Sequence, residues 1–207
     1  MPRRSDAGDG NYWDDRYRTV GSANTSWYQH RPLLSLRFIE ELGVASDSAI
    51  VDVGGGASSL VDCLVEDGFT DITVVDLSQV ALDEAKGRLA DREVEWIQAD
   101  VRAWVPSRVY DLWHDRATYH FLTSPDDQQR YWQMVRNHMR PGGHVIVATF
   151  APDGPERCSG LSVQRYDAAG LAAAMGDGFR LVRSEEELHH TPGGADQPFS
   201  WVVAART

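Results

Sequence analysis

Three consecutive glycines, Gly54, Gly55 and Gly56, follow a short β-branched run that contains Asp52. Glycine permits a sharp reversal from strand to helix, and its bare backbone lets a ligand approach closely. A helix that starts here points free N–H groups toward that ligand. Asp76 ends the next β-rich run, about 20 residues further on, where a carboxylate accepts hydrogen bonds from both hydroxyls of a ribose. The coupled pattern predicts a site for an adenosine-type cofactor.

Two kinds of adenosine cofactor fit such a loop. A dinucleotide fingerprint expects glycine or alanine three residues after Gly56, where this chain has Ser59. The sequence also lacks a Tyr-x-x-x-Lys pair. An NAD(P)-dependent reductase is therefore the less favoured alternative, and a nucleotide-binding module without catalysis is another.

The segment Asp52-Val53-Gly54-Gly55-Gly56 resembles motif I of the class I S-adenosylmethionine-dependent methyltransferases. The resemblance implies S-adenosyl-L-methionine as cofactor and S-adenosyl-L-homocysteine as product. It also implies that the loop surrounds the methionine part, that Asp76 holds the ribose and that the Asp100 region meets the adenine. The expected cofactor-binding residues are Trp27, Asp52, Gly54, Gly55, Gly56, Asp76, Leu77, Asp100, Val101 and Asp115.

Charged and aromatic residues follow the fourth predicted strand, at the edge where the acceptor side of such an enzyme is expected. The block resembles the Asp-Lys-Gly-Thr-x-Asp element of protein-lysine methyltransferases that act on translation factors. The corresponding positions hold Asp115, Arg116, Ala117, Thr118 and His120. Three positions differ, because arginine replaces lysine, alanine replaces glycine and histidine replaces the last acid. We predict His120 or His114 as a general base, with a packing or capping role as the alternative.

Four aromatic residues precede the nucleotide-binding pattern: Tyr12, Trp13, Trp27 and Tyr28. Aromatic faces attract cations, and a sulfonium is a cation, so this segment is predicted to be a lid over the methionine end. It resembles the N-terminal Tyr-Trp-Asp…Trp pattern of the same lysine enzymes and of small thiol and halide methyltransferases. Anchoring of a flap onto the core is the other reading.

The acceptor is expected to meet side chains from four segments, including the long loop at 151–166 and the loop between the last two strands. The predicted substrate residues are Tyr12, Tyr28, Arg116, Tyr119, Arg165 and His189. No metal is predicted, because His114, His120, His189 and Cys158 lack the spacing of dedicated ligands. The sequence leaves open a small-molecule or a protein side-chain acceptor, and nitrogen, sulfur or oxygen as the methylated atom.

Hydrophobic periodicity predicts strands alternating with helices. The expected strands are 49–53, 71–76, 94–97, 109–113, 144–150, 179–184 and 199–205, and the expected helices are 11–17, 33–42, 58–67, 78–89, 125–139 and 167–175. This order predicts an α/β fold, a three-layer Rossmann-like sheet of seven strands, mostly parallel with the last strand antiparallel, plus an N-terminal helical flap. One domain is expected over residues 1–207, with a flap and helix at 1–45, a cofactor-binding core at 46–150 and a substrate-side loop with closing strands at 151–207.

Composition sets further limits on the partners. The chain has 207 residues and a net charge of −11, which argues against a nucleic-acid backbone as partner. No apolar run approaches the roughly 20 residues that span a bilayer, so no membrane partner is expected. Residues 1–6 contain no apolar segment of a secretory signal. Two distant cysteines, Cys63 and Cys158, suit a reducing cytoplasm, and the expected state is monomer or homodimer.

Overall fold

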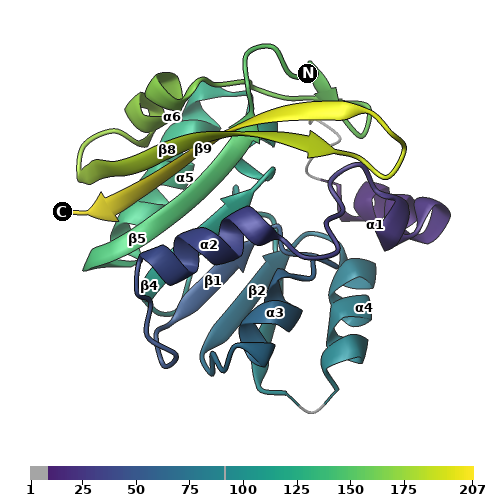
Figure 1. The fold of residues 1–207 in the computed structure, drawn as a ribbon, viewed down its shortest axis with the longest axis horizontal. Coiled ribbons are helices and arrows are strands. Elements are labelled where there is room, and N and C mark those ends of the chain that lie inside the picture. Colours follow the sequence, from purple (N-terminus) through teal and green to yellow (C-terminus); the bar gives the residue numbers. More distant parts are fainter. Residues whose placement is uncertain (1–8, 91) are drawn as a thin grey trace.

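A computed structural model of the protein describes residues 9–90 and 92–207 (Figure 1). The expectation about a secretory signal concerns residues 1–6, which lie outside the described residues. The helices are α1 Gly10–Val20, α2 Leu33–Glu41, α3 Leu60–Glu66, α4 Gln79–Leu89, α5 Pro125–Asn137 and α6 Ala168–Met175, with 3-10 helices η2 Ser22–Asn24 and η3 Tyr119–Phe121. The strands are β1 Ile50–Val53, β2 Ile72–Asp76, β3 Val94–Gln98, β4 Tyr110–Arg116, β5 Met139–Phe150, β6 Arg157–Cys158, β7 Leu161–Ser162, β8 Phe179–His190 and β9 Asp196–Arg206.

Within the described residues, seven strands form one sheet in the order β3-β2-β1-β4-β5-β9-β8. Strands β1 to β5 pair in parallel, and β9 is antiparallel to both β5 and β8. The predicted fold class is confirmed, including the single antiparallel strand. Because β1, β2 and β4 are parallel, their carboxyl ends lie on the same side of the sheet, and the strand order reverses between the neighbours β1 and β4, where such sheets bind ligands.

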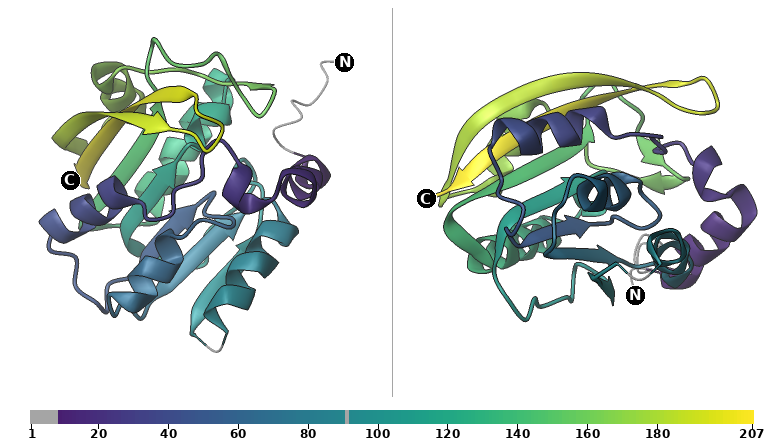
Figure 2. Two further views of the ribbon diagram at one scale, coloured as in Figure 1. Left: turned by 45° about the vertical axis from the view of Figure 1, so that its right-hand side comes forward. Right: turned by 60° about the horizontal axis from the view of Figure 1, so that its bottom comes forward.

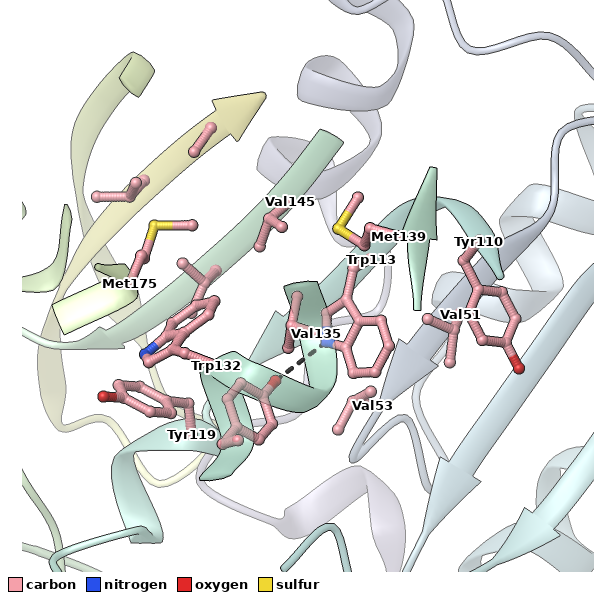
Figure 3. Close-up of a cluster of buried hydrophobic side chains, with 14 of the residues drawn as sticks. Val51, Val53, Tyr110, Trp113, Tyr119, Trp132, Val135, Met139, Val145 and Met175 are labelled. Atoms are coloured by element: carbon pink, nitrogen blue, oxygen red, sulfur yellow. Dashed lines mark hydrogen bonds between the residues drawn. The ribbon is translucent and has the colours of Figure 1, made fainter. Parts of the chain in front are cut away.

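Helices cover both faces of the sheet (Figures 1 and 2). Apolar side chains of α2, α3 and α4 pack on one face, with Phe38, Leu64 and Leu82 fully buried. Helices α5 and α6 pack on the other face through an aromatic-rich cluster (Figure 3). In this cluster Trp113 of β4 donates its indole N–H to the Tyr131 hydroxyl of α5 at 3.1 Å, so the two elements are joined by a directed bond as well as by apolar contact.

Asp14 is one of the residues that bond the N-terminal flap to the nucleotide-binding core. Asp14 Oδ1 of α1 accepts hydrogen bonds from Ser78 Oγ at 2.7 Å and from the Val80 amide at 3.1 Å. Ser78 is the N-cap of α4, and its Oγ also accepts from the Ala81 amide. The Asp14 side chain of α1 therefore supplies part of the cap of α4. This contact holds the flap next to the end of β2.

Several predicted boundaries were wrong. Helix α1 is capped by Asp9 and runs from Gly10 to Val20, beyond the predicted 11–17. Strand β4 continues to Arg116, past the predicted end at 113, and β5 starts at Met139, ahead of the predicted start at 144. The predicted loop at 151–166 contains the small β6–β7 hairpin. Strand β8 runs to His190, where a loop was expected. The sequence did not predict this part of the strand because most side chains of β8 are exposed at the sheet edge and show no apolar alternation.

Candidate active site

The glycine loop between β1 and α3 is tightly enclosed. Gly54 and Gly56 have φ of +69° and +43°, a backbone that side chains rarely adopt. A Cβ at Gly54 would lie 1.7 Å from Thr118 Oγ1, and a Cβ at Gly56 would lie 2.8 Å from Asp76 Oδ2. The loop is therefore pressed against the ends of β2 and β4. Ser59, which departs from the dinucleotide fingerprint, donates to the Gln29 carbonyl at 2.8 Å and ties the loop to the N-terminal segment.

Asp76 closes β2 at the edge of a cavity. Its Oδ1 accepts from the Ser78 amide at 2.7 Å, and its Oδ2 faces the glycine loop. Burial raises the pKa of Asp76 to about 7, and the nearby carboxylates Asp52 and Asp14 act in the same direction. A group that donates hydrogen bonds to Oδ2 would favour the ionised carboxylate, so this position suits a ligand with hydroxyl donors.

Cavity 1 lies over the ends of β2, β3 and β4 and has a volume of about 810 Å³, counted with its opening to solvent. At one end it is lined by Asp76, Leu77, Ala99, Asp100 and Val101. The Asp100 carboxylate is held by the Arg102 guanidinium at 2.6 Å. The backbone of the 99–101 segment therefore borders the cavity beside a carboxylate that is already ion-paired.

Aromatic residues of the flap roof the other end of cavity 1. Trp13 packs edge-on against Trp27 and Phe121, with ring centroids 5.9 and 5.2 Å apart. Tyr17 packs edge-on against Trp27 at 6.0 Å, and all four rings line the cavity. Aromatic faces in this arrangement attract a positive charge and exclude water. Trp13 and Tyr17 are four residues apart on α1, a helical spacing that could have identified Tyr17 from the sequence.

Cavity 2 lies on the other side of the glycine loop, beneath the segment at 25–35. On its wall Asp52 Oδ1 lies 2.7 Å from His114 Nδ1, and His114 Nε2 lies 2.9 Å from Ser35 Oγ. A serine–histidine–aspartate order is known from hydrolases, but Ser35 is only 1% exposed and sits inside α2. The chain of bonds therefore joins α2, β4 and β1. Asp52 Oδ2 has no hydrogen-bond partner among the described residues.

His114 was predicted as a general base, and the structure occupies both of its ring nitrogens. With Nδ1–H donating to the Asp52 carboxylate, Nε2 accepts the Ser35 hydroxyl. His114 borders cavity 2 and not cavity 1 in the described part of the chain. A proton of an acceptor in cavity 1 therefore has no direct path to this ring.

His120, the other predicted base, lies in η3 and is fully buried between Phe121 and Phe150, with ring centroids 4.5 and 4.9 Å apart. Burial, with a smaller effect of Arg116, lowers the pKa of His120 to about 3. Within residues 9–90 and 92–207, neither ring nitrogen of His120 has a hydrogen-bond partner. In this part of the chain, the His120 side chain lines neither of the two cavities. The geometry corrects the expectation that His120 faces the acceptor.

Asp115 and Tyr119 were predicted to meet the cofactor and the substrate, and both are buried away from the two cavities as described. Asp115 accepts from the Thr118 and Tyr119 amides, each at 3.0 Å, and from the Tyr131 hydroxyl. Burial raises the pKa of Asp115 to about 6. These bonds fold the turn after β4, where Ala117 has φ of +68°. A left-handed backbone favours glycine, which is the residue of the resembled element.

The remaining predicted substrate residues are spread over three places. Tyr28 lines cavity 2, and Arg116 lines both cavities. Tyr12 donates to the Ser159 carbonyl and so joins α1 to the β6–β7 hairpin. Arg165 donates to the Gly154 carbonyl at 2.9 Å, and His189, in β8, is 2.8 Å from the Ser26 carbonyl. Of the described residues, those last three line neither cavity.

Other lining residues were not predicted. For cavity 1 they are Tyr17, Ala99, Arg102, Ala117, Thr118, Phe121, Leu122 and Cys158, and Trp13, which was predicted as part of the lid, lines it too. Burial raises the pKa of the Cys158 thiol to about 12, so it borders the cavity as a neutral group. No group of three histidine, cysteine or acidic residues in the described ranges is arranged to hold a metal ion. None of the described helices is both long and apolar enough to cross a membrane.

The chain is similar to known methyltransferases in sequence and in structure. The family described as "Methyltransferase domain" matches residues 50–143. EEF1A lysine methyltransferase 2 from Danio rerio is 25% identical over 67% of this chain and 66% of its own length. Trans-aconitate 2-methyltransferase from Azoarcus sp. (strain BH72) is 35% identical over 48% of this chain and 38% of its own length. The matches thus span less than two thirds of these curated relatives.

A solved structure of a SAM-dependent methyltransferase from Anabaena variabilis ATCC 29413 superimposes with a TM-score of 0.77, covering 100% of this chain and 97% of that chain at 14% identity. Residues 50–143 are similar to the methyltransferase-domain family, and the chain has the fold of an S-adenosylmethionine-dependent methyltransferase. The sequence matches support an S-adenosylmethionine-dependent methyltransferase, with S-adenosylmethionine as its cofactor. This assignment favours the methyltransferase prediction over the NAD(P)-dependent reductase.

Proposed function

We propose that the protein transfers a methyl group from S-adenosylmethionine to an acceptor at the end of cavity 1 formed by Trp13, Trp27, Arg116, Phe121 and Cys158. The observation that carries the proposal is the pairing of two unlike ends in one cavity. One end has the glycine loop and Asp76. The other has aromatic faces suited to a sulfonium cation.

The described residues supply a suitable group for each part of the cofactor. Asp76 Oδ2 is the acceptor for the ribose hydroxyls, and the backbone at 99–101 borders the adenine position. Asp52 Oδ2, buried and without a hydrogen-bond partner among the described residues, suits the ammonium group of the methionine half. When bound, the cofactor supplies an electrophilic methyl group on a sulfonium. The chain supplies position and a cavity shielded from water.

The acceptor is proposed to need no base from the protein. Both histidines predicted for that role are withdrawn from cavity 1, His114 by its two hydrogen bonds and His120 by burial and a low pKa. An acceptor that is already an anion, or an amine that reaches the cavity neutral, needs none. The names of the relatives include a lysine and an aconitate enzyme, and both acceptor types agree with such a site.

Calorimetry and a methyl-transfer assay test the proposal together. S-adenosylhomocysteine is expected to bind at micromolar affinity, roughly −8 kcal/mol, and to raise the melting temperature. Purified protein with labelled S-adenosylmethionine is then screened against small metabolites and folded proteins. Binding of NAD in place of the adenosyl compound would overturn the cofactor assignment. Adenosyl binding without any transfer would indicate a nucleotide-binding module instead of an enzyme.

A further inference from the structure

Arg116 is a buried cation with unused hydrogen-bond donors. Its side chain is 9% exposed, and burial lowers the pKa of its guanidinium. Nη1 donates to the Trp27 carbonyl at 3.0 Å, and the guanidinium lies over the Phe199 ring at 4.6 Å. Nε and Nη2 have no hydrogen-bond acceptor in the described part of the chain. Leaving two donors of a buried guanidinium without acceptors is costly, so Nε and Nη2 point to a ligand.

The unused donors have the geometry of a carboxylate fork. Nε and Nη2 form one edge of the guanidinium plane, and two parallel N–H groups on such an edge bind a carboxylate with both oxygens. Arg116 borders cavity 1 beside Phe121 and Cys158, and it also borders cavity 2 beside Asp52. Arg116 therefore lies between the two cavities, at the junction proposed for the methionine half of the cofactor and the methyl acceptor.

Glu187 is the charge nearest to this edge, and it is already used. Its Oε2 is 3.9 Å from Arg116 Nε, beyond hydrogen-bond distance. Oε2 accepts from the Trp201 indole at 2.9 Å, and Oε1 accepts from Gln29 Nε2 at 3.0 Å. Glu187 thus reduces the local charge without filling the donors.

The other titratable neighbours of Arg116 are two histidines, a thiol and a second arginine, Arg16, which also acts on that thiol. His120 and His189 both have lowered pKa values, from burial first and from Arg116 second, so both are uncharged near neutral pH. Cys158 is a neutral thiol. A ligand at this junction therefore meets the two free donors of Arg116, with the Arg16 guanidinium acting on the same thiol and the carboxylates of Glu187 and Asp52 nearby.

We infer that Arg116 is the carboxylate-binding residue of the site, an inference that rests on the proposed function. The same chemistry has two sources, a carboxylate on the methyl acceptor and the carboxylate of the methionine half of the cofactor. The experiment therefore needs one arm for each source.

The cofactor arm compares S-adenosylhomocysteine with 5′-methylthioadenosine, which shares the adenosine and the thioether but lacks the amino-acid half. Both are titrated calorimetrically into the full chain and into Arg116→Met. If the cofactor supplies the carboxylate, the variant binds S-adenosylhomocysteine at least about tenfold more weakly and 5′-methylthioadenosine equally well. If each compound binds the variant as tightly as the unmodified chain, the cofactor does not supply the carboxylate and the acceptor arm decides.

The acceptor arm uses succinate, glutarate and citrate as probes, with succinamide as the uncharged match. They are titrated into free and S-adenosylhomocysteine-saturated protein, and a wider set of carboxylic acids is assayed for methyl transfer. If the acceptor supplies the carboxylate, acids bind or are methylated and the amide is not. Arg116→Met then raises Kd or KM at least about tenfold with a smaller change in kcat, and Arg116→Lys restores part of the loss.

Two variants separate recognition from folding. Glu187→Gln removes a negative charge beside the fork, so it should strengthen carboxylate binding severalfold, opposite in sign to Arg116→Met. The pair Arg116→Met and Glu187→Gln in one chain removes both charges and reports on folding by thermal melting. Arg140→Met, at the start of β5 where Arg140 pairs with Asp111 at 3.0 Å, is the surface control.

Unchanged affinities of Arg116→Met for S-adenosylhomocysteine and for every acid would overturn the inference, as would equal losses for 5′-methylthioadenosine and S-adenosylhomocysteine. Transfer only to amines, undiminished in Arg116→Met, would overturn it too. A wild-type chain that binds acids through Arg116 but no adenosyl compound would instead refute the proposed function and leave the carboxylate site standing.

Discussion

The two ends of cavity 1 are built in different ways. The end proposed to bind the adenosine, called the adenosine end, comes from short segments that directly follow strands: the glycine loop after β1, Asp76 at the end of β2 and the 99–101 segment after β3. The end proposed to bind the acceptor, called the acceptor end, combines the flap, the end of β4 and Cys158 of the β6–β7 hairpin. The first end is fixed by the sheet itself. The second depends on how distant segments pack onto it.

The largest effect should come from the glycine loop. Gly54→Ala places a Cβ against Thr118 on a left-handed backbone, so we expect a stability loss of about 2–4 kcal/mol and no measurable binding of S-adenosylhomocysteine. Gly68→Ala is the matched control, since Gly68 has φ of +89° but nothing within 4 Å of an added Cβ. It should cost only about 1–2 kcal/mol and keep the affinity. Equal loss of binding in both variants would contradict a specific role of the glycine loop in cofactor binding.

Sequence predicted the adenosine end because its residues occur at set offsets from strands that show their own apolar pattern. The acceptor end was predicted poorly for a physical reason. His120 and Arg116 are four residues apart and both polar, yet one is sealed between phenylalanines and the other borders both cavities. The packing of β9, the flap and the η3 turn determines which of these two side chains is sealed in and which borders the cavities. The helical spacing of Trp13 and Tyr17 was available, whereas Cys158 carried no local signal.

Asp76 tests the adenosine end by a single side chain. Asp76→Ala removes an acceptor of charge-assisted hydrogen bonds, each worth about 1.5–3 kcal/mol. We expect calorimetry to show S-adenosylhomocysteine binding at least about tenfold weaker, with the fold retained. Asp83→Ala on the outer face of α4, where Asp83 accepts only from Gln79 in the described structure, serves as control. An unchanged dissociation constant would place the ribose elsewhere.

The pH dependence of binding sharpens the same assignment. The pKa of Asp76 is about 7 in the free protein. Hydroxyl donors favour the ionised carboxylate, so binding lowers that pKa, and below pH 7 the ligand must displace a proton from Asp76. Affinity is therefore full above pH 7 and falls below it. Between pH 8 and pH 6 we expect a loss of about tenfold.

The measurement should use 5′-methylthioadenosine, because it lacks the titratable amino-acid half of the cofactor. Asp76→Asn, which has no carboxylate to protonate, should bind weakly at all pH values and show no step. A step of the same size in Asp76→Asn would assign the titration to another group.

The smallest effect is expected at the acceptor end, from His120, one of the two histidines predicted from the sequence as a general base. A general base contributes typically about 10²–10⁴-fold to turnover, and loss of it would make His120→Leu nearly inactive. His120 instead lies between two phenylalanine rings with a pKa of about 3 and no hydrogen-bond partner among the described residues. Leucine keeps the apolar contacts and removes two buried polar nitrogens, so we expect turnover within about threefold of wild type and an unchanged or slightly higher melting temperature. The rate profile between pH 5 and 8 should be the same in both proteins. A loss of 100-fold or more, together with a rising pH step that only the wild type shows, would return His120 to the acceptor and require η3 to rearrange when substrate binds.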